Sequence, residues 1–319
     1  MTLLLTRREA ASLLDLPQAM AVTRDVLREQ AAGAAVAIPP RHVRMVRGAL
    51  RIVSGALLES RRAGVRTGPA VDLAGKPHTA MLYDAESGDL LCIMGYPFAT
   101  LRTGATVGVA TDLLARADAR QIGMIGTGRN ALSLLEAACH VRPVERIRVY
   151  SRNAERRTAF AEQAQTAVGV PVEPAADAPS AVRDAAVVYV ATDSLTPALH
   201  ADWLAPGAFV ASMGRPSELD PSVYLAAARV VVGHRKHEEE YFDVGQYQHH
   251  LLELVKGGQI AWSDVLELCD VAVGHAPGRS APDQIVVFKE SQGGFGDIAF
   301  ANWAYTQAVE RGIGQQWDG

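Results

Sequence analysis

Two glycines separated by one residue stand between an apolar run and a helix-forming stretch in the middle of the chain. The apolar run, residues 122–125, is typical of a buried strand, and Gly126 and Gly128 follow it directly. Gly126 permits a tight turn, Gly128 lets the backbone approach a ligand, and the small Ala131 allows close helix–strand packing. The free N–H groups at the start of the next helix favour an anion. The spacing therefore predicts a site for the pyrophosphate of a dinucleotide, although an ordinary strand-to-helix turn has the same pattern.

The strand expected next, residues 145–150, ends at Ser151 and Arg152. A Rossmann unit contacts the adenosine ribose at this point, about 20 residues after the glycines. An acidic residue would accept hydrogen bonds from the 2′-hydroxyl and favour NAD(H), whereas a hydroxyl beside a guanidinium suits a 2′-phosphate. This pair predicts NADP(H) in preference to NAD(H), with a solvated Arg152 as the alternative.

The elements around these residues alternate between strands and helices. Strands are expected at residues 121–125, 146–150, 186–191, 209–214 and 229–233, with helices at 129–140 and 153–167. This alternation is typical of a doubly wound parallel sheet. The segments that leave the carboxyl ends of its strands, including Ala191-Thr192 and Met213-Gly214, would lie on the cofactor side.

The first part of the chain is expected to be α+β. Residues 6–34 are predicted to be helical, with Thr6 and Glu9 forming a capping box and Pro17 opening a second helix. Strands at 49–54 and 64–67 and a hairpin with strands 79–84 and 90–94 follow. A helix over 99–115 then places Arg102 and Thr103 near its N-terminus, where anions bind.

The last part of the chain completes both domains. Residues 234–268 are predicted to be mostly helical, residues 283–288 to form a strand, and residues 289–297 to form a glycine-rich loop. A last helix, 298–310, is expected to pack on the first part. The predicted fold is α/β, with a Rossmann doubly wound parallel sheet (116–297) inserted in an α+β substrate-binding and dimerisation domain (1–115 and 298–319).

Composition excludes several function classes. The net charge of −4 gives no general attraction to nucleic acid or to an acidic membrane. No apolar stretch is long enough to span a bilayer, and the N-terminus lacks the pattern of a signal peptide. Cys92, Cys139 and Cys269 lie far apart without the spacing of a metal site. A cytoplasmic protein without a metal and without nucleic-acid or membrane partners is expected.

Eight stretches together resemble the ornithine cyclodeaminase/μ-crystallin family over almost the whole chain. They occur in the family's order: Pro40-Arg41, residues 64–67, residues 84–88, residues 101–105, Gly126-Thr127-Gly128, Ala191-Thr192 with Pro197, residues 218–220, and residues 288–299. The resemblance implies a homodimer and hydride exchange between a nicotinamide and an α-amino or α-imino carbon. Members reduce imines, oxidatively deaminate amino acids, or cyclise ornithine or lysine.

The resemblance also implies a substrate site. Arg41, Arg66 and Arg102 would hold the substrate carboxylate and the cofactor, with Arg66 at the position of a family lysine. Bidentate pairs of arginine with a carboxylate fix its orientation. Arginine keeps its proton, so Arg66 can bind a carboxylate but is a poor proton donor. No aspartate follows Gly214, which disfavours ornithine cyclisation, and Arg215 favours a neutral or acidic imino acid.

The group that protonates the imine nitrogen is left open at this stage. His42 and His78 are candidates by position, although a lone histidine is more often structural, and Asp72 and water are others. Asp297 lies near the nicotinamide by resemblance, or serves as a helix N-cap. The catalytic residues are therefore predicted to be Arg66, His78 and Asp297.

The sequence as a whole predicts an NADP(H)-dependent reductase of ketimines or imino acids, reversible as an amino-acid dehydrogenase. An NAD-dependent ornithine cyclodeaminase is one alternative, and a catalytically idle, μ-crystallin-like protein that binds NADPH and a small ligand is another. The expected cofactor contacts lie at strand ends and helix starts: Arg102, Thr103, Gly126, Thr127, Gly128, Arg129, Asn130, Ser151, Arg152, Asn153, Ala191, Thr192, Met213, Gly214 and Ser291.

Overall fold

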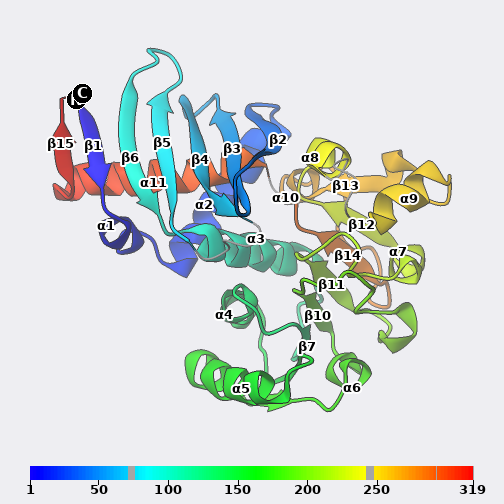
Figure 1. Ribbon diagram of the computed structural model, residues 1–319. Coiled ribbons are helices and arrows are strands. Elements are labelled where there is room, and N and C mark those ends of the chain that lie inside the picture. The colour runs from blue at the N-terminus through cyan, green and yellow to red at the C-terminus, as the bar shows by residue number, and fades with distance from the viewer. Residues whose placement is uncertain (71–75, 242–247, 292, 319) are drawn as a thin grey trace. The chain divides into compact units, whose positions relative to one another are not determined.

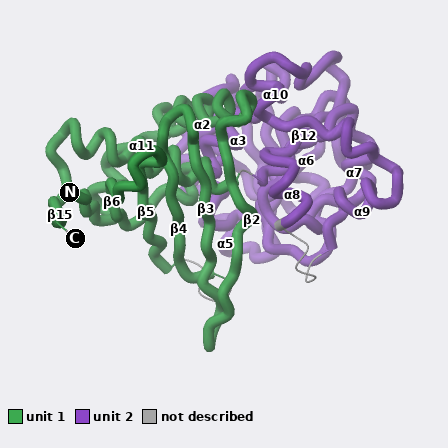
Figure 2. Tube along the Cα trace, turned by 90° about the horizontal axis from the view of Figure 1, so that it is seen from above, with its two compact units in different colours: residues 1–102, 292–319 green, residues 103–291 purple. Residues whose placement is uncertain are grey.

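The computed structural model describes residues 1–70, 76–241, 248–291 and 293–318. It divides the chain into two compact units, residues 1–102 with 292–319 and residues 103–291 (Figure 2). The predicted boundaries were 115/116 and 297/298, so the second unit starts and ends earlier than expected. The helix that was assigned to the first domain continues into the second unit, where Thr111 Oγ1 lies 2.7 Å from the hydroxyl of Tyr189.

The first unit is built on a seven-stranded mixed sheet with the order β15-β1-β6-β5-β4-β3-β2. Its strands are β1 (Thr2–Leu5), β2 (Ala35–Arg44), β3 (Ala49–Leu57), β4 (Arg62–Ala70), β5 (His78–Asp84), β6 (Leu90–Tyr96) and β15 (Gln315–Trp317). Neighbouring strands from β2 to β6 are antiparallel, and β1 pairs with β6 in parallel. Strands β1, β2 and β15 were not predicted. Strands β1 and β15 are too short to show a periodic pattern, and β2 contains Pro39 and Pro40.

Two helices follow β1. Helix α1 (Arg7–Ala11) has the predicted capping box: Thr6 Oγ1 accepts from the Glu9 N–H at 3.3 Å, and the Glu9 carboxylate accepts from the Thr6 N–H at 2.8 Å. Helix α2 (Leu16–Ala31) has Pro17 in its first turn, as expected, and Asp15 as its N-cap. The region predicted to be helical is therefore two helices that end before β2.

Helix α11 (Gly294–Arg311) runs across one face of this sheet and contacts its strands from β2 to β6 (Figure 1). The helix starts at Gly294 rather than at residue 298, and Gly293 is the N-cap. Asp297 is therefore inside the helix, and its predicted N-cap role is wrong. A Cβ at Gly294 would lie 2.2 Å from the Ser54 carbonyl oxygen. Glycine at the start of α11 therefore allows close packing on β3. Because glycine-rich sequence is typical of loops, the sequence predicted a loop for this segment.

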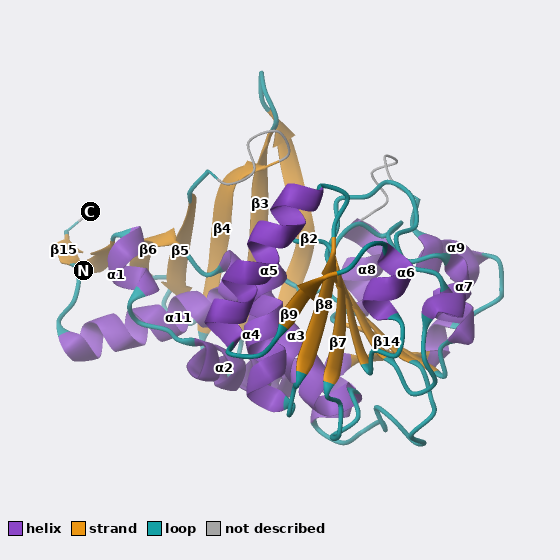
Figure 3. Cartoon of the chain, turned by 90° about the horizontal axis from the view of Figure 1, so that it is seen from below, coloured by secondary structure: helices purple, strands orange, loops and turns teal. Residues whose placement is uncertain are grey.

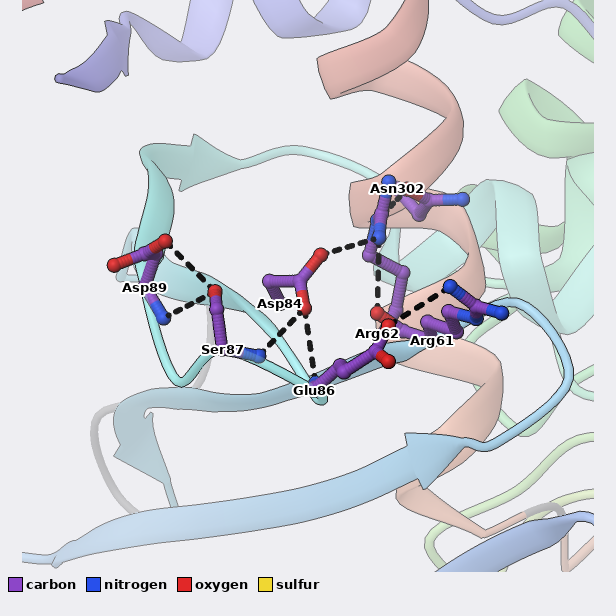
Figure 4. A network of polar contacts seen from close by, with 7 residues as sticks. All are labelled: Arg61, Arg62, Asp84, Glu86, Ser87, Asp89 and Asn302. Carbon is purple, nitrogen blue, oxygen red and sulfur yellow. Dashed lines mark hydrogen bonds and ion pairs between the residues drawn. The ribbon is translucent and has the colours of Figure 1, made fainter.

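The turn between β5 and β6 helps to fix α11 on the sheet. Asp84 accepts hydrogen bonds from the N–H groups of Glu86 and Ser87, and Arg62 lies 3.3 Å from the Asp84 carboxylate (Figure 4). Arg62 Nε also donates to Asn302 of α11 at 2.9 Å. One arginine therefore joins the turn, the sheet and the helix that carries Asp297.

The second unit is an eight-stranded, fully parallel sheet with the order β13-β12-β14-β11-β10-β7-β8-β9 (Figure 3). Its strands are β7 (Gln121–Ile125), β8 (Arg146–Tyr150), β9 (Val172–Pro174), β10 (Val187–Val190), β11 (Phe209–Ser212), β12 (Arg229–Val232), β13 (Val265–Glu267) and β14 (Val286–Lys289). The strand order reverses between β7 and β10, and dinucleotides bind at such a switch point. The predicted α/β fold class is confirmed.

Helices cover both faces of the parallel sheet. They are α3 (Ala99–Leu114), α4 (Ala131–Val141), α5 (Ala154–Val168), α6 (Ala178–Val182), α7 (Pro221–Ala226), α8 (Arg235–Tyr241), α9 (His250–Lys256) and α10 (Leu268–Ala272). On β10, Val188 and Val190 pack in the core cluster that includes residues of α6, α7 and α9, whereas Tyr189 points to α3. This alternation is the period of two expected of a strand. Among the described residues, no helix is long and apolar enough to cross a membrane.

Candidate active site

A buried carboxylate on α11 organises a polar cluster in the first unit. Asp297 is 2% exposed, and its Oδ2 lies 2.9 Å from Arg66 Nε on β4. Its Oδ1 lies 3.1 Å from Arg102 Nε and accepts a hydrogen bond from the Tyr96 hydroxyl at 2.9 Å. We call Asp297, Arg66, Arg102, Tyr96 and the neighbouring His78 the Asp297 cluster. The predicted catalytic residues therefore lie together, and Tyr96 joins them.

Asp297 is a permanent anion in this setting. Burial raises the pKa of Asp297, but the two arginines and the hydrogen bonds outweigh burial and lower the pKa to about 2. The carboxylate is therefore ionised at neutral pH and has no proton to give. Its role in this geometry is to hold the guanidinium groups of Arg66 and Arg102.

His78 contacts the guanidinium group of Arg66. Arg66 Nη1 lies 2.6 Å from His78 Nδ1, and because arginine can only donate, Nδ1 must accept. Burial, then the charge of Arg66, lowers the pKa of His78. Arg66 also lies over the Tyr96 ring, 5.5 Å from its centroid. These contacts favour a positioning role for His78, so its predicted role as the proton donor stays a prediction.

A pH profile distinguishes these roles of His78. We expect wild-type kcat/KM to fall only on the acid side of pH 6.5, the ordinary histidine value, because protonation of Nδ1 removes the acceptor for Arg66. Substitution of His78 by Gln keeps an acceptor, so kcat/KM should stay within about tenfold of wild type, the effect of one altered hydrogen bond. The acid limb of the profile should disappear in H78Q. Loss of all activity at every pH would instead assign the proton transfer to His78.

Two other predicted groups of the first unit, Arg41 and His42, are exposed on β2. Arg41 is exposed on β2 and pairs with Ile52, whereas Arg66 pairs with Val53. Directly opposite residues share a face and adjacent residues alternate, so the register puts Arg41 on the other face of the sheet from Arg66. The predicted grouping of three arginines is not formed. His42 is exposed on β2, and Asp72 lies outside the described residues.

The glycine loop of the second unit fits a pyrophosphate. Gly126 has φ +103°, and a Cβ there would lie 2.2 Å from the Ala191 carbonyl oxygen. A Cβ at Gly128 would meet no described atom within 4 Å, so this side of the loop is open. Helix α4 starts directly afterwards, and its N-cap, Asn130, makes no side-chain capping hydrogen bond within the described chain. The loop and the helix start can therefore receive an anion.

The residues predicted to contact the ribose lie beside this loop. Thr127 Oγ1 donates to Ser151 Oγ at 3.1 Å, which joins the glycine loop to the end of β8. Arg152 is exposed next to them. Asn153 caps helix α5 by accepting from the Arg156 N–H at 2.8 Å, so its side chain has a structural partner. A hydroxyl and an arginine, with no acidic residue, thus stand where the ribose is expected.

Glu218 links the ends of two neighbouring strands and was only a motif match in the sequence. Its Oε1 accepts from the Ser212 hydroxyl and from the Gly214 N–H, both at 2.7 Å. Its Oε2 accepts from the N–H and the hydroxyl of Thr192, both at 2.9 Å. Burial raises the pKa of Glu218, and the positive charge of Lys289 opposes this shift. The carboxylate therefore holds two segments that were predicted to contact the cofactor, after β10 and after β11.

The remaining predicted cofactor and substrate residues lie at several places in the two units. The Met213 N–H donates to Val190 at 3.2 Å, and Arg215 Nε donates to the Asp193 carbonyl at 2.9 Å. The others have these surroundings: Thr103 is buried in α3, Arg129 is exposed after the glycines, Ala191 follows β10, and Ser291 Oγ accepts from the His234 N–H at 3.3 Å. Their roles stay predictions.

Comparisons with known proteins agree with this architecture. The model of the ornithine cyclodeaminase/mu-crystallin family matches residues 1–312. A Delta(1)-pyrroline-2-carboxylate reductase of Bacillus cereus is 34% identical over 241 residues, which cover 74% of this chain and 72% of the relative. The structure of the Thermococcus litoralis Delta(1)-pyrroline-2-carboxylate reductase in complex with NADH and L-proline is 26% identical, with a TM-score of 0.88, and covers 99% of this chain and 100% of that one. An archaeal alanine dehydrogenase dimer with bound NAD is 26% identical, also with a TM-score of 0.88, over 99% of each chain.

Proposed function

The chain belongs to the ornithine cyclodeaminase/mu-crystallin family, and from this premise we propose that it is an NADP(H)-dependent reductase of imino acids, reversible as an amino-acid dehydrogenase. The observation that carries the proposal is the Asp297 cluster. Two guanidiniums are held at one buried carboxylate, and guanidinium groups suit the carboxylate of an imino acid. Relatives named for pyrroline-2-carboxylate reduction and alanine dehydrogenation support the reaction class.

The chain's own residues would bind and orient the reactants. The carboxylate of the imino acid would bind Arg66 and Arg102, whose positions Asp297 and His78 fix. Fixed orientation lowers the entropic part of the barrier. Asp297 is ionised and Arg66 keeps its proton, so we infer that the proton for the imine nitrogen comes from water or from His78.

The dinucleotide would be held by the second unit. Gly126, Gly128 and the start of α4 would bind its pyrophosphate, and Thr127, Ser151 and Arg152 its adenosine ribose with the 2′-phosphate. When bound in its reduced form, its nicotinamide supplies the hydride. Relatives have been solved with NADH or NAD. The proposed preference for NADP(H) rests on Ser151 and Arg152 at the end of β8 in this chain.

The ribose site makes a testable prediction. Replacing Ser151 by Asp and Arg152 by Ala should weaken NADPH binding by roughly 100-fold, because two ligands of the 2′-phosphate are lost and a negative charge is added. NADH binding should stay within about threefold or improve. Dissociation constants from quenching of protein fluorescence give both values. Equal losses for NADPH and NADH would show that these residues do not select the cofactor.

Comparison of two reactions separates the proposal from its alternatives. The proposed reductase oxidises NADPH in the presence of pyrroline-2-carboxylate and releases no ammonia from ornithine. A cyclodeaminase would release ammonia from ornithine without net cofactor turnover. The loop after β11, Gly214-Arg215-Pro216, carries a cation and no acid, which disfavours binding of a cationic side-chain amine. Tight NADPH binding without turnover of any imine would instead identify a binding protein.

We further propose a homodimer, supported by the archaeal relative solved as a dimer. The mass in solution, measured by light scattering after size-exclusion chromatography, should be twice the 34.0 kDa of the chain. A monomer at micromolar concentration would contradict this proposal.

A further inference from the structure

A second arginine lies against the end of β8, where the adenosine ribose is expected. Arg157, near the start of α5, donates from Nη1 to the Ser151 carbonyl oxygen at 2.7 Å. Its guanidinium also lies over the Tyr150 ring, 5.2 Å from the ring centroid. Arg152, which was predicted as a ligand of the cofactor, is exposed, whereas Arg157 is half-buried. Two contacts with the chain itself therefore hold the Arg157 side chain beside Ser151.

The charge of Arg157 has no anionic partner in the part of the chain that the structure describes. Its side-chain contacts there are a carbonyl oxygen and an aromatic ring, neither of which carries a formal charge. Its Nε is shielded from water and has no hydrogen-bond acceptor among the described residues. Because arginine has five N–H donors in a planar fork, donors are left for a ligand.

The place of Arg157 on α5 indicates that this ligand is an anion. The start of a helix carries a partial positive charge, which disfavours an arginine there. Partial burial of a guanidinium without an anion adds to this unfavourable energy. The cation–π contact with Tyr150 opposes both effects only in part. An anion bound by Arg157 at this end of α5 would relieve them.

The neighbouring residues indicate which anion this is. Thr127 Oγ1 donates to Ser151 Oγ at 3.1 Å, so Ser151 lies between the glycine loop and Arg157. A dinucleotide whose pyrophosphate binds at Gly126 and Gly128 would have its adenosine ribose at the end of β8. The anionic group on that ribose is the 2′-phosphate of NADP(H), whereas NAD(H) has only hydroxyl groups there. Guanidinium groups bind phosphate oxygens with charge-assisted, often bidentate hydrogen bonds.

Resting on the proposed function, we propose that Arg157 is a specificity-determining residue that binds the 2′-phosphate of NADP(H) together with Arg152. The Ser151 carbonyl and the Tyr150 ring hold the Arg157 guanidinium in place, so little side-chain freedom is lost when the phosphate binds. NAD(H) brings no anion to this guanidinium, and the preference for NADP(H) follows from that difference.

Dissociation constants of NADPH and NADH, measured by fluorescence titration, test this role. Replacing Arg157 by Met keeps a long side chain that can pack on Tyr150. We expect R157M to weaken NADPH binding roughly tenfold to 100-fold, the effect of losing charge-assisted hydrogen bonds, and to change NADH binding by less than about threefold. R157K keeps the charge without the planar fork, so its loss of NADPH affinity should be smaller.

Arg146 provides the matched control, because it lies at the opposite end of the same strand and forms an exposed ion pair with Glu173. R146M removes the same charge and should leave both dissociation constants within about twofold of wild type. A second measurement needs no nicotinamide. Adenosine 2′,5′-bisphosphate should raise the melting temperature of the wild-type protein more than 5′-AMP does, and R157M should lose this difference.

The results separate this role from the proposed function. If the wild type prefers NADPH and R157M keeps the full preference, or if R157M weakens NADPH and NADH equally, the role of Arg157 is refuted and the preference for NADP(H) stands. If the wild type binds NADPH no more tightly than NADH, the preference for NADP(H) fails, and the role of Arg157 fails with it. Selective binding that depends on Arg157, without reduction of any imine, would refute the reductase and support the role of Arg157.

Discussion

Replacing Asp297 by Asn is expected to lower kcat/KM by roughly 100-fold or more, because Arg66 and Arg102 lose the carboxylate that fixes them. Small displacements of binding groups have effects of this size on catalysis. The amide can still accept the hydrogen bond from the Tyr96 hydroxyl, but it cannot neutralise either guanidinium. Steady-state kinetics under saturating NADPH measure the effect.

The same substitution is expected to destabilise the protein by about 3–5 kcal/mol, the usual effect of removing one partner from a buried ion pair. Asp25 is a suitable control, since it pairs with Arg28 on the surface of α2 with 70% of its side chain exposed. Substitution of Asp25 by Asn should change the free energy of unfolding by less than about 1 kcal/mol. Urea denaturation of both variants makes the comparison. Equal stability of D297N and D25N would contradict the structural role of Asp297.

The dependence of the free energy of unfolding on acidic pH also tests the role of the Asp297 carboxylate. The pKa of Asp297 is lowered in the folded chain to about 2 from its ordinary value of 3.8. The unfolded chain therefore takes up this proton first as pH falls. The ionised carboxylate contributes its full stabilisation above pH 4 and loses it between about pH 4 and pH 2, by roughly 2 kcal/mol. The free energy of unfolding of D297N should lack this part of the pH dependence.

Replacing Glu218 by Gln is expected to weaken dinucleotide binding about tenfold. The glutamine amide provides one oxygen acceptor, so its NH₂ group would face two of the four donors that now point at the carboxylate. An unsatisfied buried donor costs about 1–3 kcal/mol. The segments at Thr192 and Gly214 would shift to avoid it. Fluorescence titration with NADPH measures the dissociation constant.

Two comparisons separate this effect from general destabilisation. Glu253 is an exposed glutamate on α9, and substitution of Glu253 by Gln should leave both NADPH affinity and the melting temperature unchanged. For E218Q, the pyruvate-imine KM measured at saturating NADPH should change less than the NADPH dissociation constant. Wild-type affinity for NADPH in E218Q would refute the positioning role of Glu218.

The fold was predictable where the sequence signal is local. The glycine loop, strand β8 before the predicted ribose site, and each strand or helix of the alternating pattern occupy short segments. The structure has them where expected. Strand β15 is three exposed residues that, in the part of the chain the structure describes, pair with β1 alone, at the other end of the chain. No local pattern reveals such a strand. The start of α11 was missed because glycines needed for close packing resemble a loop.

The residue types of the candidate site were predictable from the sequence. Which of these residues lie together was less predictable. Arg66, Arg102 and Asp297 were named from motifs, and the structure brings them together. Arg41 was grouped with them, but the register of β2 against β3 decides its face, and the register includes a bulge between Ile38 and Arg41. A shift of one residue moves a side chain to the other face.

The most direct test of the reductase is the fate of the hydride. NADPH labelled with deuterium at either transferable position of the nicotinamide ring is mixed with the enzyme and an imine, and the amino acid is analysed by mass spectrometry. We expect one of the two labelled cofactors to transfer deuterium to the α-carbon, with one NADPH oxidised for each amino acid formed. An amino acid without deuterium from both labelled cofactors, or no consumption of NADPH with any imine, would contradict hydride transfer at the C–N bond.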